Sequence, residues 1–177
     1  MEILEIEIKA YCSSTDSVRN SLRSMGAVQG DTVNESDLYF NHPGRDFGRT
    51  DEALRIRQSN DRTVLTYKGP KIGERTKTRI ERETGVDDFK SLRTILHDLG
   101  FRESGNVQKK RETWILEGIN VCLDLVEGLG SFVELEKIGT GRETVENRLF
   151  ELAAQLGLEQ FERRSYLELL LEKNARD

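Results

Sequence analysis

The stretch Glu5-Ile6-Glu7-Ile8-Lys9, near the start of the chain, alternates charged and apolar side chains. Successive side chains of a β-strand point to opposite faces of a sheet. The alternation therefore predicts a strand with Glu5, Glu7 and Lys9 on one face and Ile6 and Ile8 on the other.

The same alternation continues through much of the chain. The sequence predicts eight strands, at residues 2–11, 36–41, 53–59, 63–69, 77–85, 107–116, 119–127 and 131–137. In the third of these, Arg55 and Arg57 oppose Leu54 and Ile56, and in the last, Glu134 and Glu136 share one face. Each strand therefore has a charged face and an apolar face.

Four stretches carry apolar residues at helical spacing instead. The sequence predicts helices at residues 15–25, 88–99, 143–156 and 166–173. A glycine follows each of the first three, which suits a left-handed C-terminal cap. Eight strands and four helices in a chain of 177 residues indicate one α+β domain, residues 1–177.

The paired charges decide between two arrangements of these strands. A sheet with one solvated face produces such alternation without any function. Carboxylates two residues apart on one strand, however, repel one another unless a cation relieves them. Eight strands also suffice to close a barrel that holds one small ligand. We favour a closed eight-stranded antiparallel β-barrel, with the helices outside and the charged faces lining a tunnel.

The charged faces carry two kinds of group. Hard carboxylate ligands suited to Mg²⁺ or Mn²⁺ come from Glu5, Glu7, Asp124, Glu134 and Glu136. Cationic groups suited to phosphate oxygens come from Lys9, Arg55, Arg57, Lys68, Arg79, Lys109 and Arg111. Together they match a polyanion that arrives with metal, and donors spread along several strands favour a triphosphate over a monophosphate.

Other classes of function have little support. With a net charge of −5 and a pI near 5.3, a nucleic-acid-binding surface is not expected. There is no apolar run that would span a bilayer and no signal-peptide pattern, so we expect a cytoplasmic protein. Cys12 and Cys122 lie far apart without metal-ligand spacing and are interpreted as reduced packing residues. The sequence does not decide between a monomer and a homodimer.

The motifs, in this order, resemble the CYTH superfamily, also called triphosphate tunnel metalloenzymes. This family includes adenylate cyclases of the CyaB type and thiamine triphosphatases. The resemblance covers nearly the whole chain, at residues 5–9, 37–40, 53–57, 66–70, 109–111, 122–130, 132–136 and 165–169. It independently implies an eight-stranded antiparallel barrel with a charged tunnel.

The resemblance also implies roles for single residues. Metal would be held by Glu5, Glu7, Asp124, Glu134 and Glu136, with one of Glu81 or Glu83. The phosphates would be held by Lys9, Arg55, Arg57, Lys68, Arg79, Lys109 and Arg111. We predict Glu5, Glu7 and Lys9 as the catalytic residues.

The resemblance leans towards a CyaB-like enzyme that converts ATP to cyclic AMP and pyrophosphate. The same tunnel would serve a triphosphatase acting on inorganic, thiamine or nucleoside triphosphate, because water then replaces the ribose hydroxyl as nucleophile. A non-catalytic polyphosphate or nucleotide sensor ranks lower, since it would not need the acidic residues. The glycine- and lysine-containing stretch 69–77 is either a lid over the ligand or an ordinary solvated loop.

Overall fold

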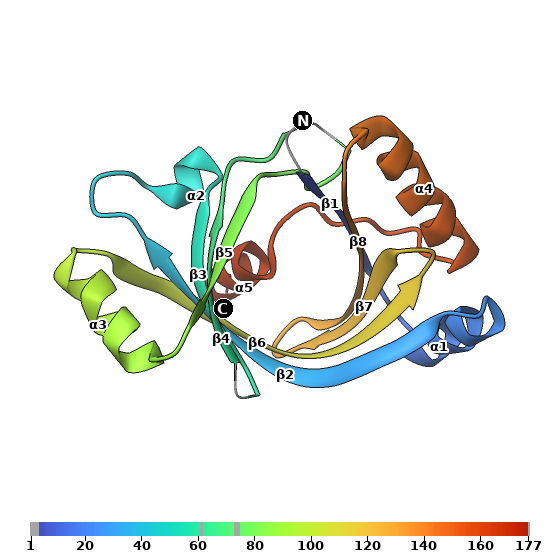
Figure 1. The fold of residues 1–177 in the computed structure, drawn as a ribbon, viewed down its shortest axis with the longest axis horizontal. Helices are drawn as coiled ribbons and strands as arrows, with labels where there is room; N and C mark the ends of the chain where they lie inside the picture. The colour runs from blue at the N-terminus through green and yellow to red at the C-terminus, as the bar shows by residue number, and fades with distance from the viewer. Residues whose placement is uncertain (1–3, 61, 73–74, 177) are drawn as a thin grey trace.

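One strongly curled antiparallel sheet dominates the computed structural model, which describes residues 4–60, 62–72 and 75–176 (Figure 1). Its eight strands in the described residues are β1 (Leu4–Tyr11), β2 (Val28–Asn41), β3 (Ala53–Ser59), β4 (Arg62–Lys68), β5 (Glu81–Val86), β6 (Arg102–Leu116), β7 (Ile119–Val126) and β8 (Gly130–Gly139). They are ordered β1-β8-β7-β6-β2-β3-β4-β5 across the sheet. The predicted α+β class and the eight antiparallel strands are confirmed.

Helices pack on both faces of this sheet. The helices of the described residues are α1 (Thr15–Ser24), α2 (Phe47–Thr50), α3 (Phe89–Asp98), α4 (Arg142–Gln155) and α5 (Tyr166–Asn174). On the convex side, α1 and α4 cover β1, β7 and β8, and α3 covers β2 and β3. Helix α5 lies inside the curl, against β6, so the prediction that the helices pack outside is wrong for this one helix (Figure 1). None of these helices is long and apolar enough to cross a membrane.

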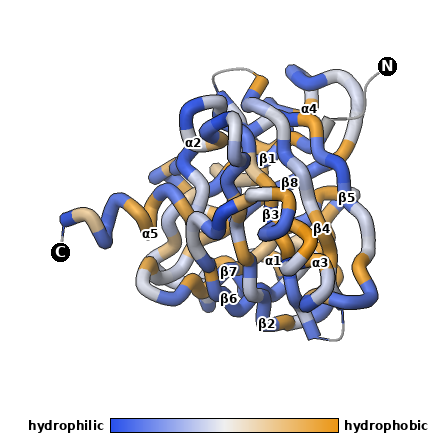
Figure 2. The backbone as a smooth tube through the Cα atoms, turned by 90° about the vertical axis from the view of Figure 1, so that its left-hand side faces the viewer, coloured by the Kyte–Doolittle hydropathy of each residue, from blue (hydrophilic) through white to orange (hydrophobic). Residues whose placement is uncertain are grey.

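The apolar faces of the strands make the core beneath the outer helices. Ile6 and Ile8 of β1 pack with Leu149 and Leu152 of α4, and all four side chains are buried. Figure 2 shows hydrophilic and hydrophobic positions alternating along the strands. Since the apolar face of β1 points outward to α4, its charged face points into the curl, as the alternation predicted.

The predicted closure of the barrel is wrong. The sheet ends at β1 and β5, and no ladder joins these two strands in the described residues. The chain before β5 instead runs beside β1, where Lys77 N donates to Glu7 O at 2.9 Å and Arg79 N to Glu5 O at 3.3 Å. The predicted strand 77–85 is therefore split. Its first part covers the edge of β1, and its second part, β5, pairs with β4.

Other boundaries differ because two strands are longer than predicted. β2 begins at Val28 and β6 at Arg102, since the two strands pair along most of their length. Their early residues include Gly30 and Gly105, which are typical of turns, and the long-range pairing overrides that local preference. Helix α2 was not predicted, because four residues are too few to show periodicity. Of the segment 69–77, interpreted as either a lid or a solvated loop, residues 73 and 74 lie outside the described residues.

A second segment covers the rest of the free edge of β1. Glu162 N donates to Lys9 O at 2.8 Å, and the carboxyl of Glu162 accepts from the Tyr11 hydroxyl at 3.0 Å. The same carboxyl accepts from the backbone N and Nε of Arg164, at 2.8 and 3.0 Å. Hydrogen bonds from the Arg164 side chain lower the pKa of Glu162 to about 2. This carboxylate thus ties β1 to the segment that leads into α5.

We expect Glu162→Gln to lower the melting temperature at neutral pH and to have little effect near pH 2. The folded pKa of about 2 lies below the ordinary value of 4.5. The contribution of the ionised group is therefore complete above pH 4.5 and lost as the pH falls towards 2. Thermal melts of both proteins over this range measure it, and a difference that stays constant with pH would contradict the assignment.

Candidate active site

The concave face of the sheet encloses a cavity of about 440 Å³. Nearly every predicted site residue lines it: Glu5, Glu7, Lys9, Arg55, Arg57, Lys68, Arg79, Glu81, Glu83, Lys109, Arg111, Glu134 and Glu136. Asp124 does not. The structure therefore brings together, from six strands or their approaches, the charged side chains that the alternation placed on inward faces.

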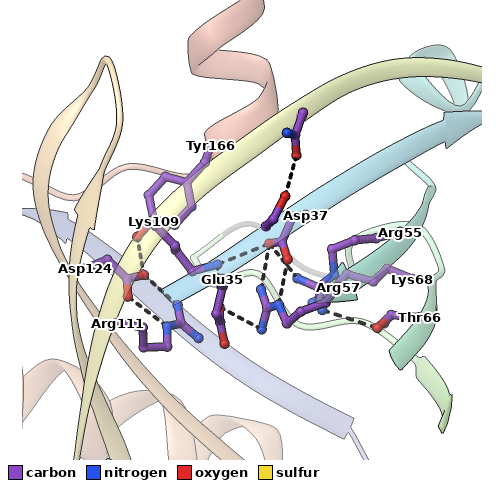
Figure 3. A network of polar contacts seen from close by, with 12 residues as sticks. Glu35, Asp37, Arg55, Arg57, Thr66, Lys68, Lys109, Arg111, Asp124 and Tyr166 are labelled. Carbon is purple, nitrogen blue, oxygen red and sulfur yellow. Dashed lines mark hydrogen bonds and ion pairs between the residues drawn. The ribbon is translucent and has the colours of Figure 1, made fainter. Parts of the chain in front are cut away.

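One wall of the cavity is basic and is organised around Asp37 of β2 (Figure 3). Arg57 Nε and Nη2 donate to the two carboxyl oxygens at 2.7 and 2.8 Å. Lys109 Nζ approaches Asp37 Oδ2 to 3.1 Å and Arg55 Nη1 approaches it to 3.5 Å. Glu35 also contacts Lys109 and Arg57, at 2.8 and 3.3 Å. Arg55 Nη2 also lies 3.7 Å from Glu83 Oε1, so two buried carboxylates and one half-exposed carboxylate face these three cations.

Asp37 remains ionised despite its burial. Burial alone raises the pKa of its carboxyl, but the charges of Arg55, Lys109 and Arg57 outweigh this and hold the pKa well below its usual range. Sequence reasoning did not assign Asp37 to the site, although the residue falls within a motif that carries the family resemblance. Its position on the inward face of a predicted strand was the signal that could have found it.

Asp124 lies behind this wall and not in the cavity. Both of its oxygens accept from Arg111, with Nε at 2.7 Å and Nη2 at 2.6 Å, and one also accepts from the Tyr166 hydroxyl at 2.8 Å. Arg111 Nη2 also contacts Glu134. The arrangement supports a role for Asp124 in positioning Arg111 (Figure 3) and lends no support to its predicted role as a metal ligand.

The opposite wall is acidic. In the ladder between β1 and β8, Glu7 lies opposite Glu136. Burial raises the pKa of Glu5 to about 8 against the opposing charge of Lys68. Three neighbouring carboxyls add to the shift, those of Glu81, Glu136 and Glu7. Crowded, partly desolvated carboxyls of this kind are suited to a hard divalent cation, so the donor set fits Mg²⁺ or Mn²⁺.

These carboxyls are not yet arranged as a metal site. In the part of the chain that the structure describes, no three acidic, histidine or cysteine side chains converge as ligands to one ion. Internal cations hold them instead: Lys77 contacts Glu7 at 2.8 Å, and Lys68 contacts Glu81. Lys77 was not predicted as a site residue. Its two-residue spacing from Arg79 was the available signal.

Lys9 lies between the two walls and against α5. Its Nζ donates to the backbone O of Arg164 at 2.5 Å and lies 4.1 Å from the centre of the Tyr166 ring. Burial, and next the charge of Lys77, lower the pKa of Lys9 to about 7, against the opposing effect of Glu134. An amine with this pKa can accept a proton at neutral pH, which an ordinary lysine cannot.

An antiparallel sheet curled around opposed basic and acidic walls agrees with the motif resemblance in strand number and charged interior, but not in closure of the barrel. Residues 4–166 match the family model of the CYTH domain. The chain belongs to this family.

Individual relatives are similar to this chain over more than nine-tenths of its length. A Methanocaldococcus jannaschii protein, provisionally named an adenylate cyclase, is 38% identical over 172 residues, covering 94% of this chain and 98% of the relative. Adenylate cyclase CyaB of Aeromonas hydrophila is 29% identical over 171 residues, covering 92% of this chain and 86% of that protein. A Pyrococcus horikoshii protein of known structure superposes with a TM-score of 0.88 at 42% identity, covering 96% of this chain and 99% of that one.

We expect Asp37→Asn to destabilise the protein by about 3–5 kcal/mol, because the cations around it then lose a buried counter-charge. Urea unfolding measures the loss, and Asp31→Asn, at an exposed position of the same strand, should change stability by less than about 0.5 kcal/mol. Added tripolyphosphate should restore part of the loss. Equal effects of the two substitutions would show that the basic wall does not depend on Asp37.

Proposed function

We propose that this protein is a divalent-metal-dependent enzyme that binds ATP by its triphosphate in the cavity and converts it to cyclic AMP and pyrophosphate. The names of the M. jannaschii and A. hydrophila relatives support the cyclase reaction. The observation that carries the triphosphate site is the gathering of three cations, Arg55, Arg57 and Lys109, on one wall of the cavity.

One donor of this wall is unpaired. Arg55 is buried, with a relative exposure of 6%, and among the described residues its Nε has no hydrogen-bond partner. Glu35 Oε2 also has no hydrogen bond there, but Lys109 Nζ lies 2.8 Å from it. Burying a charged donor without a partner costs about 1–3 kcal/mol or more. Phosphate oxygens would supply the missing acceptor. Arg57 and Lys109, which both contact Asp37, would orient the other phosphates of the triphosphate.

The acidic wall would supply the metal ligands, with Glu5, Glu7 and Glu136 as the residues best placed to hold Mg²⁺ or Mn²⁺. When bound, such a cation would neutralise the charge that develops on the phosphate oxygens. In the cyclase reaction the ribose 3′-oxygen bonds to the α-phosphorus and pyrophosphate leaves. Lys9 Nζ would accept the proton that the hydroxyl loses, for which its pKa of about 7 is suited.

Hydrolysis of a triphosphate is the second candidate. Each contact argued above is made to phosphate or metal, so the same walls would also hold tripolyphosphate or thiamine triphosphate. Water would then attack the terminal phosphorus in place of the ribose hydroxyl. A non-catalytic sensor has less support, because it has no need of the crowded carboxyls that face the basic wall.

Turnover assays separate these candidates. The purified protein is incubated with Mg²⁺ or Mn²⁺ and each of ATP, thiamine triphosphate and tripolyphosphate, and cyclic AMP, pyrophosphate and phosphate are measured together. Cyclic AMP with equimolar pyrophosphate from ATP is the expected result. Phosphate release without cyclic AMP would favour the triphosphatase, and binding without any product would favour the sensor.

We expect Glu5→Gln to lower metal-dependent turnover at least about a hundredfold while leaving the melting temperature of the metal-free protein unchanged or higher. The reason is that burial raises the pKa of Glu5 to about 8, so glutamine replaces a largely neutral group in the metal-free protein, whereas a bound cation needs the carboxylate. Glu127→Gln, at an exposed carboxyl, is the matched control. Loss of stability together with full turnover would contradict the proposed role.

A further inference from the structure

A short strap, residues 75–80, completes the enclosure of the cavity where the sheet is open. Its backbone follows the free edge of β1, and its side chains alternate as in a strand. Lys77 and Arg79 line the cavity. Thr76 and Thr78 are buried, with relative exposures of 1% and 0%. The strap therefore presents its cations to the cavity and its hydroxyls to the opposite side.

The two hydroxyls anchor the strap to α4. Thr76 Oγ1 donates to Glu146 Oε1 at 2.8 Å, and the Thr76 and Thr78 hydroxyls lie 2.7 Å apart. Glu146 is buried, on a helix whose other buried residues are Leu149, Leu152 and Ala153. A buried carboxyl among apolar positions needs partners, and Glu146 has the strap's hydroxyl and, at 3.4 Å, Arg142 Nε of its own helix. Thr76, Thr78 and Glu146 thus form a latch on the strap.

The latched strap holds Lys77 against the acidic wall. Lys77 Nζ lies 2.8 Å from Glu7 Oε1 and 4.0 Å from Glu134 Oε1. Both carboxyls are predicted metal ligands. A divalent cation bound to Glu7 would lie within a few ångströms of this ammonium, and two positive charges at such a distance in a partly buried site repel strongly. Lys77 and the metal therefore compete for the same oxygens.

We propose that Lys77, fixed by the latch, is a resident counter-ion of the acidic wall, which a divalent cation displaces when it binds. The proposal rests on the metal site of the proposed function. In the metal-free protein Lys77 limits the repulsion between buried carboxylates. On displacement its ammonium is freed for the phosphates, so metal and triphosphate favour each other's binding.

Mn²⁺ binding in the absence of any triphosphate tests the competition directly. Free Mn²⁺ is followed by electron paramagnetic resonance during titration of wild type, Lys77→Met and Lys71→Met. Lys71 lies on the same connection but pairs with Asp51, at 2.7 Å, away from the acidic wall. We expect Lys77→Met to bind Mn²⁺ at least about tenfold more tightly, and Lys71→Met to bind as wild type does.

Stability gives a second readout of the same variants. Without metal, Lys77→Met should melt at a lower temperature than wild type, and saturating Mn²⁺ should raise its melting temperature more than that of wild type. Unchanged or weaker Mn²⁺ binding by Lys77→Met would overturn the proposal. Thr76→Val, which removes the hydroxyl at constant shape, should tighten Mn²⁺ binding by a smaller factor, and it provides the test if Lys77→Met does not fold.

Turnover measured on the same proteins separates this inference from the proposed function. If wild type binds Mn²⁺ but converts no triphosphate, the proposed enzymatic function is contradicted. The ratio of the Mn²⁺ affinities of wild type and Lys77→Met would still decide the role of Lys77. If wild type and Lys77→Met bind Mn²⁺ with equal affinity and the enzyme is active, the role of Lys77 as a counter-ion is overturned and the proposed function is not. Absence of Mn²⁺ binding in every variant would overturn the metal site and the counter-ion together.

Discussion

The structure depends on the balance of buried charge across one cavity. Asp37 holds Arg55, Arg57 and Lys109 inside the curled sheet, and in the part of the chain that the structure describes Arg55 Nε has no hydrogen-bond partner. Burying charge is costly unless it is paired. Gathering three cations on one wall therefore adds little stability, and the proposed polyanionic ligand would account for their presence.

The curl of the sheet makes this arrangement possible. The outer helices cover the apolar faces of the strands, which leaves the charged faces nowhere to point but inward. Helix α5 then fills part of the concavity and contributes Tyr166, whose hydroxyl and ring contact Asp124 and Lys9. The strap and the segment 160–162 cover the edge of β1, so irregular chain completes what a closed ladder would otherwise provide.

Local periodicity predicts much of the site, because the direction of a strand side chain is a local property. It identified Arg55, Arg57, Glu134 and others as inward-facing without knowledge of strand order. It could not predict closure, which depends on the tilt and stagger of strands far apart in sequence. Nor could it place Asp124, because the docking of α5 and the pairing with Arg111 remove that carboxyl from the cavity. Lys77 is in phase with Arg79 on the predicted strand 77–85, so the alternation could have found its inward direction, but not its pairing with Glu7, which is distant in sequence.

A crystal structure with Mn²⁺ and a non-reactive ATP analogue tests the central claim most directly, since anomalous scattering locates the metal independently of the ligand. The account predicts phosphate oxygens within hydrogen-bond distance of Arg55, Arg57 and Lys109, and metal on the carboxyls of β1 and β8. An analogue bound outside the cavity, with the internal ion pairs of both walls unchanged, would contradict it.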